Sequence, residues 1–347
     1  MRTGSLHVRA VLTALTSLLA AGVVLSACGS STASSNGSIT LYSGQHVQTT
    51  DSLIAGFEKQ TGIRVNVRSD DEATLADQMV TEGSRSPADV FFTENSPVLQ
   101  FLSGKGLLAT LPSSTLSRTP SKFNSPKGNW VGVSARVSVL IYDPKLIAKS
   151  QLPTTVLQLA NPQYKGLLAM SPGETDVQPI ITSVLHTYGH ARALKWLEGV
   201  KANSTGHILA NNETIADEVN RGEVAFGFVN QYYWWRMRAE IGAANVTSKI
   251  TYFARYDPGY VIDVSGAAVM KSSRHKELAQ KFVAFLVSKK GQEIIDHSIS
   301  FEYPIASGVT TVQPETPFNQ LRPNAITISE LGTGSAAIAL LHATGLL

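Results

Sequence analysis

The stretch that decides the fold runs from Ile39 to Ser69 and reads "ITLYSGQHVQTTDSLIAGFEKQTGIRVNVRS". Short β-rich runs open and close it, at Ile39–Ser43 and Ile63–Ser69. Between these runs, Leu53 and Phe57 lie four residues apart and so share one face of a helix. The stretch therefore predicts a strand, a helix and a second strand, which is the repeating unit of a parallel α/β sheet.

The same alternation continues along the chain. Further strands are expected at Ala88–Thr93, near Val137, at Gly166–Met170 and at Val224–Val229. Helical patterns lie between these strands, and one long amphipathic helix is expected over Lys276–Ile295. The order favours an α/β fold, and a chain of 347 residues favours two domains.

Composition and motifs narrow the function. The net charge of +3 is dispersed along the chain, so no nucleic-acid partner is expected. The chain contains no G-x-S-x-G, P-loop, H-E-x-x-H or C-x-x-C motif. We therefore expect a binding protein rather than an enzyme.

The first 27 residues predict a signal peptide, with Arg2 and Arg9 before an apolar run. The run ends in "LSAC", which resembles a bacterial lipobox and predicts cleavage before Cys28 and lipid on its sulfur. Residues 28–38 would then form a lipidated, flexible tether. Cys28 is the only cysteine, so no intrachain disulfide can form. The protein is expected at the outer face of the cell membrane; an uncleaved membrane helix is the alternative.

Polar side chains follow the predicted strands, where α/β sheets bind their ligands. His46 follows the first strand, Glu94 the third, and Tyr232 and Tyr233 the strand Val224–Val229. Carboxylate and phenolate are hard anionic donors, and imidazole is borderline. Three anionic oxygens would balance the charge of Fe(III). Together with one nitrogen, they suit Fe(III) better than Zn(II) or Ca(II). On spacing alone, ordinary roles as caps, turns and core aromatics remain open for all four residues.

Several stretches resemble the bacterial ferric-ion-binding proteins, the periplasmic iron carriers of ABC transporters. The stretches are "LYSGQH", "EGSRSPADVFFTE", "VGVSARVSVLIYD", "FVNQYYWW", "RYDPGYVIDVSGAAVMKSS" and "KFVAFLVSKKGQE". "SGQH", "SRSPADVFFTE" and "NQYYW" together are specific to this group, whereas "SGAAV" and "FVAFLVSKKGQE" occur across many solute-binding proteins. The resemblance covers about Ile39 to Tyr303.

The resemblance implies a two-lobed, type II Venus-flytrap fold with mixed, mostly parallel sheets and a hinge of crossing strands. Lobe 1 would hold residues 39–136 and about 263–312, and lobe 2 residues 137–262 and about 313–347. His46, Glu94, Tyr232 and Tyr233 would bind Fe(III) in the cleft between the lobes. The partners would be an ABC permease and its ATPase, and the protein would be a monomer.

The family also completes its iron site with an exogenous anion, here expected to be phosphate or carbonate. The residues that align with the anion contacts are Asn95, Gly173, Glu174, Thr175, Asn212 and Asn230. The sequence departs from the family there, because "GET" replaces a small "SGA" turn and Asn95 replaces a glutamine. Glu174 would repel phosphate if it faced the site, so a further hypothesis makes Glu174 itself a metal ligand. Arg136 is expected either to neutralise charge near the cleft or to form a surface ion pair.

Two alternatives remain open. The same fold could bind a sugar, a phosphonate or an organic cation, with Trp234 and Trp235 as stacking groups; under the iron hypothesis, these indoles would instead begin the next helix. More remotely, Glu94 and His46 could act as an acid–base pair in a hydrolase.

Overall fold

The computed structural model describes residues 37–309, 311 and 315–347, which belong to one compact unit, Ser35–Leu347. The predicted signal peptide, Cys28 and residues 29–36 of the tether lie outside the described residues. Among the described helices, none is both long and apolar enough to cross a membrane.

The predicted strand–helix–strand unit forms as expected. It consists of β1 (Ser38–Gly44), α1 (Val47–Thr61) and β2 (Arg64–Ser69), with β1 and β2 parallel. The strand β3 (Val90–Thr93) also pairs with β1 in parallel, and its last residue lies opposite Gly44. The segments that follow β1 and β3 therefore begin at the same edge of the sheet.

Helices cover both faces of this part of the sheet. Neighbouring residues of a strand point to opposite faces, and Phe91 packs in a different core cluster from Phe92. Phe91 packs in the cluster shared with α2 (Glu72–Glu82) and α3 (Ser96–Gly104). Phe92 packs in the cluster of α1 and α9 (Lys276–Leu286), where the Phe57 and Phe282 ring centroids are 5.0 Å apart.

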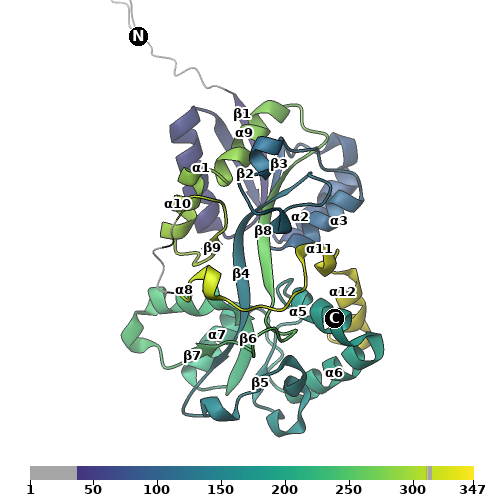
Figure 1. Ribbon diagram of the computed structural model, residues 1–347, viewed down its shortest axis with the longest axis vertical. Helices are drawn as coiled ribbons and strands as arrows, with labels where there is room; N and C mark the ends of the chain where they lie inside the picture. Colours follow the sequence, from purple (N-terminus) through teal and green to yellow (C-terminus); the bar gives the residue numbers. More distant parts are fainter. Residues whose placement is uncertain (1–36, 310, 312–314) are drawn as a thin grey trace, which may run out of the picture. The chain divides into compact units, whose positions relative to one another are not determined.

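Two long strands connect the lobes, and Figure 1 shows them side by side. They are β4 (Val131–Tyr142) and β8 (Ile262–Val269), which pair antiparallel. The first half of β4 pairs with β8, and its second half, from Ser138, pairs with β6 (Phe226–Asn230). Because β8 also pairs with β3, the two strands form the hinge between the lobes. The residue limits of the lobes stay a prediction.

The strand order is β2-β1-β3-β8-β4-β6-β5, and β5 (Leu168–Ala169) is parallel to β6. Two short strands, β7 (Lys249–Thr251) and β9 (Tyr303–Pro304), pair with β4 outside this path. The pairs made by β4 and β8 in the hinge are antiparallel, whereas β1, β2 and β3 pair in parallel within lobe 1. The sheet is therefore mixed.

Helices of the second lobe surround β5 and β6. They are α5 (Val177–Tyr188), α6 (His190–Asn203), α7 (Asn212–Arg221) and α8 (Gln231–Ile241). Near the C-terminus, α12 (Ser335–Ala343) packs on α5 and α6 (Figure 1), and α11 (Ile328–Leu331) contacts both α3 and α5. The described chain also contains α4 (Ser113–Leu116) and several 3-10 turns.

One expected helix is wrong. The segment Lys276–Ile295 forms two helices, α9 and α10 (Lys289–His297), with a break at Val287 and Ser288. The Ser288 hydroxyl accepts a hydrogen bond from the Gly291 amide, so it caps the second helix. The apolar pattern hides the break because buried residues continue through it, as at Val287.

Candidate metal-binding site

The two tyrosines lie in the first turn of α8. The expectation that this helix begins at Trp234 is wrong, because α8 begins at Gln231. The Gln231 side chain fixes this turn, since its oxygen accepts from the Val137 amide at 2.8 Å and its nitrogen donates to the Phe301 carbonyl at 2.9 Å. Both phenols are buried, with Tyr232 0% and Tyr233 4% exposed.

His46 and Glu94 reach the tyrosines from the other lobe. His46 precedes α1, and its amide donates to the Gln45 side chain at 2.7 Å. Its Nδ1 forms an ion pair with Glu94 Oε1, while the Tyr232 hydroxyl donates to Glu94 Oε2 at 3.3 Å. The His46 ring centroid lies 5.1 Å from that of Tyr232 and 6.5 Å from that of Tyr233. The structure thus brings together all four residues predicted to bind iron.

Sequence analysis missed Asp176, which lies at the centre of this group. Its Oδ2 accepts hydrogen bonds from the hydroxyls of Tyr233, at 2.8 Å, and Tyr232, at 3.3 Å. It stands at the N-cap position of α5 but makes no side-chain capping bond, so its carboxylate is committed to the tyrosines. The signal that could have found it is its position, one residue beyond the Ser171–Thr175 segment that follows β5.

Three of the residues predicted to hold an anion surround Asp176. Asn212 Nδ2 donates to Asp176 Oδ2 at 3.0 Å, and Asn95 Nδ2 lies 3.1 Å from Asp176 Oδ1. The same Asn95 nitrogen lies 3.0 Å from Thr175 Oγ1. Asn230 lines a small cavity together with Asp176 and Asn212. These amides therefore face a carboxylate of the chain itself.

Of the other three predicted anion residues, Thr175 contacts Asn95, whereas Gly173 and Glu174 lie at the margin. Gly173 is exposed, and a Cβ added there would meet no atom within 4 Å. Glu174 is partly buried, and burial followed by the charges of Asp176 and Glu213 raises the pKa of Glu174 to about 8. No hydrogen bond joins its carboxylate to either tyrosine in the described part of the chain, in contrast to that of Asp176.

A second buried carboxylate orders the loop that carries Glu94. Glu72 Oε2 accepts from the Thr93 hydroxyl and from the amides of Glu94 and Asn95, both at 3.0 Å. Glu72 Oε1 accepts from Asn95 Nδ2 at 3.0 Å. Burial, reinforced by the charge of Glu94, raises the pKa of Glu72 to about 7. Glu72 thus positions Glu94 and Asn95 without a hydrogen bond to either phenol in the described part of the chain.

Arg136 is buried, so the alternative of a surface ion pair is wrong. It lies on β4 with 1% exposure and donates to Glu302 Oε1 at 2.5 Å. Its guanidinium carbon lies 5.9 Å from the Tyr232 ring centroid. The residue therefore places positive charge beside the phenols, although it is held by a different carboxylate.

The site carries more potential negative charge than paired positive charge. Burial, followed by the charges of Asp176 and Glu94, raises the pKa of both Tyr232 and Tyr233 well above 10. Burial lowers the pKa of His46, but Glu94 outweighs it and leaves that pKa above its usual value. Among the described residues, no lysine or arginine forms an ion pair with Glu94 or Asp176. A cation of high charge would satisfy this arrangement.

The donor set fits a hard metal ion. Histidine, cysteine and acidic side chains alone form no metal-binding group of three in the described part of the chain. Here two phenol oxygens complete the set with one imidazole and the carboxylates. His46 Nε2 is buried and has no hydrogen-bond partner, which leaves a donor available to an ion.

Little space remains beside these groups. The cavity lined by Ser171, Asp176, Asn212 and Asn230 has a volume of about 10 Å³, which is room for about one water molecule. The two indoles next to the tyrosines are occupied by protein groups. Trp234 Nε1 donates to the Ser248 carbonyl at 3.3 Å, and Trp235 stacks on Phe301.

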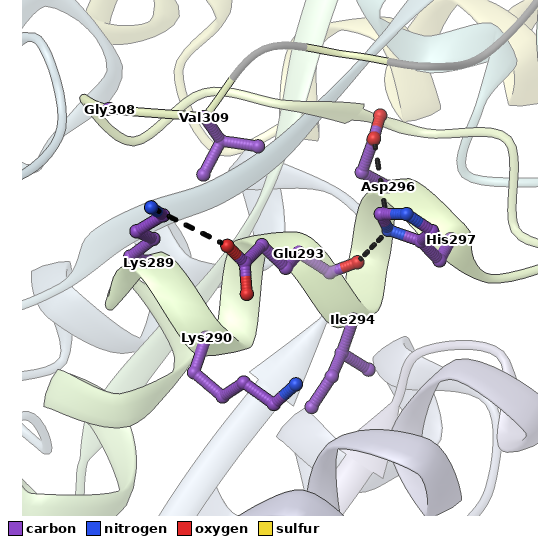
Figure 2. Close-up of a pocket in the computed structure, with 8 residues that line it drawn as sticks. All are labelled: Lys289, Lys290, Glu293, Ile294, Asp296, His297, Gly308 and Val309. Atoms are coloured by element: carbon purple, nitrogen blue, oxygen red, sulfur yellow. Dashed lines mark hydrogen bonds and ion pairs between the residues drawn. The ribbon is translucent and has the colours of Figure 1, made fainter.

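A wider hollow, of about 580 Å³, lies on α10 (Figure 2). Its lining residues are Lys289, Lys290, Glu293, Ile294, Asp296, His297, Gly308 and Val309. An exposed Lys289–Glu293 pair at 3.8 Å and a His297 hydrogen bond to the Glu293 carbonyl shape it. It contains none of the predicted ligands.

Comparison with known proteins identifies the class. Residues 43–293 match the family of bacterial extracellular solute-binding proteins, so the chain belongs to that family. The family binds solutes for transport, which confirms the expectation that the chain is not an enzyme.

Several similar proteins carry names that state iron binding. The "Fe(3+)-binding periplasmic protein" of Serratia marcescens is 35% identical over 95% of this chain and 96% of its own length. Iron-bound HitA from Pseudomonas aeruginosa is 38% identical, with a TM-score of 0.85 over 89% of this chain and 99% of HitA. A Trichodesmium protein (IdiA, FutA) in complex with iron and citrate is 30% identical, with a TM-score of 0.78 over the same share of each chain. The predicted resemblance and the type II two-lobed fold are confirmed.

Proposed function

We propose that this chain binds Fe(III) in the cleft between its lobes, through His46, Glu94, Tyr232 and Tyr233. One observation carries the proposal: side chains from both lobes meet around the two phenol oxygens. The Tyr232 hydroxyl lies 3.3 Å from Glu94 across the cleft, and the Tyr233 hydroxyl lies 2.8 Å from Asp176. Iron-binding relatives at 35–38% identity support the same cargo.

The chemistry of the donors selects the ion. A buried phenol surrounded by carboxylates keeps its proton unless a strongly charged cation displaces it. Fe(III) has the charge and hardness to do so, whereas Zn(II) and Ca(II) favour other donor sets. Arg136 then offsets part of the negative charge left beside the phenolates.

The ion would hold the two lobes in the closed arrangement. His46 and Glu94 belong to one lobe and the tyrosines to the other, so only the closed arrangement offers all the donors at once. An ion that binds the closed arrangement far more tightly than the open one shifts the equilibrium towards the closed arrangement. We take the lobes as residues 39–136 with about 263–312, and 137–262 with about 313–347.

The cellular setting completes the proposal. The protein would be a monomeric lipoprotein, anchored through Cys28 at the outer face of the cell membrane. It would deliver iron to the permease and ATPase of an ABC importer. Phosphate or carbonate as a synergistic anion stays a prediction of the family resemblance, whereas the contacts of Asp176 support a carboxylate of the chain in that role.

The direct experiment is iron loading followed by a visible spectrum and metal analysis. Purified protein should take up one Fe(III) and become coloured, because Fe(III)–phenolate absorbs visible light. Tyr232→Phe and Tyr233→Phe should each weaken or shift the band. Trp234→Phe, a matched aromatic change one residue further along α8, should leave the band in place. A protein that stays colourless and metal-free after loading would overturn the proposal.

A small organic solute is the competing cargo. The cavity beside Asp176 has room for about one water molecule, and protein groups occupy both indoles. Neither feature supports a sugar or an organic cation in this closed arrangement. A thermal shift with such a solute, and none with iron, would favour this alternative.

A further inference from the structure

We infer that Asp176 takes the place of the exogenous anion, so that this chain binds Fe(III) without phosphate or carbonate. The inference rests on the proposed function, because it concerns the same iron site. In this view, a carboxylate of the chain supplies the further negative charge of the site, instead of an ion from solution.

Asp176 already engages the amides of Asn95 and Asn212, which the family resemblance predicts as anion contacts. Each amide donates to the Asp176 carboxylate, at 3.1 Å and 3.0 Å. Tyr233 donates to the same carboxylate at 2.8 Å. An external anion would need the two amide donors, and Asp176 holds both from a covalently fixed position.

The cavity beside Asp176 is too small for a phosphate ion. The cavity between Asp176, Asn212 and Asn230 has a volume of about 10 Å³. That is room for about one water molecule, and a phosphate ion, with its phosphorus and four oxygens, is much larger. Ser171, 3% exposed, also lines this cavity, and its hydroxyl has no hydrogen-bond partner. Apolar residues line the other half of the cavity, so it offers a phosphate ion few polar partners; they are Val177, Ile180, Phe228 and Val229.

The negative charge already at the site disfavours a further anion. Two phenolates and the carboxylates of Glu94 and Asp176 together carry four negative charges, against three on the ion. The nearby Arg136 is hydrogen-bonded to Glu302, so it is shared with a further carboxylate. Adding phosphate would bring more uncompensated negative charge into a buried site, where it is costly.

The helix that carries Asp176 explains why the carboxylate is available. Asp at an N-cap usually accepts from an amide two or three residues ahead. Asp176 makes no such bond, and the Gln178 amide instead donates to the Thr175 carbonyl at 3.0 Å. With 8% exposure, the carboxylate is buried in the cleft rather than exposed to water.

The experiment measures iron uptake with and without phosphate. Stripped protein receives ferrous chloride, which oxygen free of carbon dioxide oxidises to Fe(III), in buffer free of phosphate and carbonate. Iron content, phosphorus content and the visible band are then recorded. The wild type should bind one iron in this buffer, with no phosphorus, and added phosphate should change neither the band nor the affinity.

Asp176→Asn supplies the second arm. It keeps the shape of the side chain and removes the charge, so iron affinity in phosphate-free buffer should fall by about tenfold or more. Added phosphate should restore part of that affinity and appear in the loaded protein. The matched control is Asp217→Asn, the same chemical change at an exposed position on α7, which should bind iron as the wild type does. Circular dichroism checks that both variants fold.

The outcomes separate the two proposals. A wild type that binds iron only with phosphate overturns the role of Asp176 and leaves iron binding intact. The role of Asp176 is also overturned if Asp176→Asn stays indifferent to phosphate, or if Glu174→Gln alone creates phosphate dependence. A wild type that binds no iron in any buffer overturns the proposed function itself. The phosphorus content of the wild type decides the question even if Asp176→Asn fails to fold.

Discussion

At the scale of the residue, the two phenols are the donors that distinguish this site. Both are buried, and both hydroxyls donate to carboxylates that a cation would share. Removing one phenol oxygen leaves the ring packing intact and takes away an anionic donor. Removing the imidazole takes away a neutral one.

We therefore predict unequal losses of iron affinity. Tyr232→Phe and Tyr233→Phe should each lower it by about a hundredfold or more, and His46→Ala by about tenfold. Competition with a chelator of known affinity measures the difference. Equal losses from these substitutions and from Glu94→Gln would contradict the dominance of the phenolates.

The predicted ligands could be found from the sequence because each follows a strand end. Glu94 comes directly after β3 and His46 one residue further beyond β1, and parallel pairing brings those strand ends together. Asp176 follows β5 at a greater distance, beyond a turn whose shape the sequence does not specify. Whether Glu174 or Asp176 faces the tyrosines depends on that turn, so the sequence alone could not choose between them.

At the scale of the element, hinge strand β8 carries a buried acid. Asp263 accepts hydrogen bonds from the Ser96 hydroxyl at 2.6 Å and from the Val264 amide at 2.7 Å. Burial nonetheless raises the pKa of Asp263 from 3.8 to about 6. Ser96 opens α3, so this acid ties the hinge to the helix that follows Glu94.

The raised pKa predicts a pH dependence of stability. Between about pH 4 and pH 6 the folded protein binds the Asp263 proton while the unfolded chain releases it, so the free energy of unfolding falls as pH rises. Asp263→Asn removes this titration and should make the slope of that free energy less negative across the same range. Urea unfolding of the iron-free protein at several pH values measures the slope. Asp217→Asn, a change at an exposed position on α7, should leave this slope as in the wild type. A wild-type slope in Asp263→Asn would contradict the raised pKa of Asp263.

The break between α9 and α10 gives a second prediction at this scale. Ser288 accepts from the Gly291 amide at 3.2 Å and donates to the Phe285 carbonyl at 2.6 Å. Ser288→Ala should lower the free energy of unfolding by about 1 kcal/mol. Ser52→Ala, at an exposed position inside α1, is the matched control and should cost less. A Ser288→Ala variant as stable as the control would show that the cap does not maintain the break.

The elements themselves were largely predictable. The alternation of strands and helices from Ile39 onwards appears in the structure, because apolar periodicity reports which face is buried. Periodicity does not report strand direction, so it could not show that β4 and β8 pair antiparallel in the hinge. It also could not show the break at Ser288, where a side-chain cap interrupts a continuous apolar face.

At the scale of the whole molecule, the cargo should stabilise the closed arrangement. Contacts such as Tyr232–Glu94 and Asn95–Asp176 join the lobes only when the cleft is closed. A ligand that binds the folded state alone adds about 4 kcal/mol of stability when its free concentration exceeds Kd by about a thousandfold. Iron bound by both lobes should therefore make the protein more stable and, at the same time, more compact.

We predict that iron loading raises the melting temperature by several degrees and lowers the radius of gyration. Differential scanning calorimetry and small-angle X-ray scattering of the same samples measure the two effects. The Tyr232→Phe, Tyr233→Phe double variant should show neither. A rise in melting temperature without compaction would mean that iron binds one lobe only, against the closing mechanism.

The measurement that tests the central claim most directly is the resonance Raman spectrum of the iron-loaded protein, excited within its visible band. Phenolate ring modes should dominate the wild-type spectrum, weaken in Tyr232→Phe and in Tyr233→Phe, and vanish in the double variant. An iron-loaded protein whose spectrum lacks phenolate modes, or keeps them unchanged in the double variant, would contradict iron binding by Tyr232 and Tyr233.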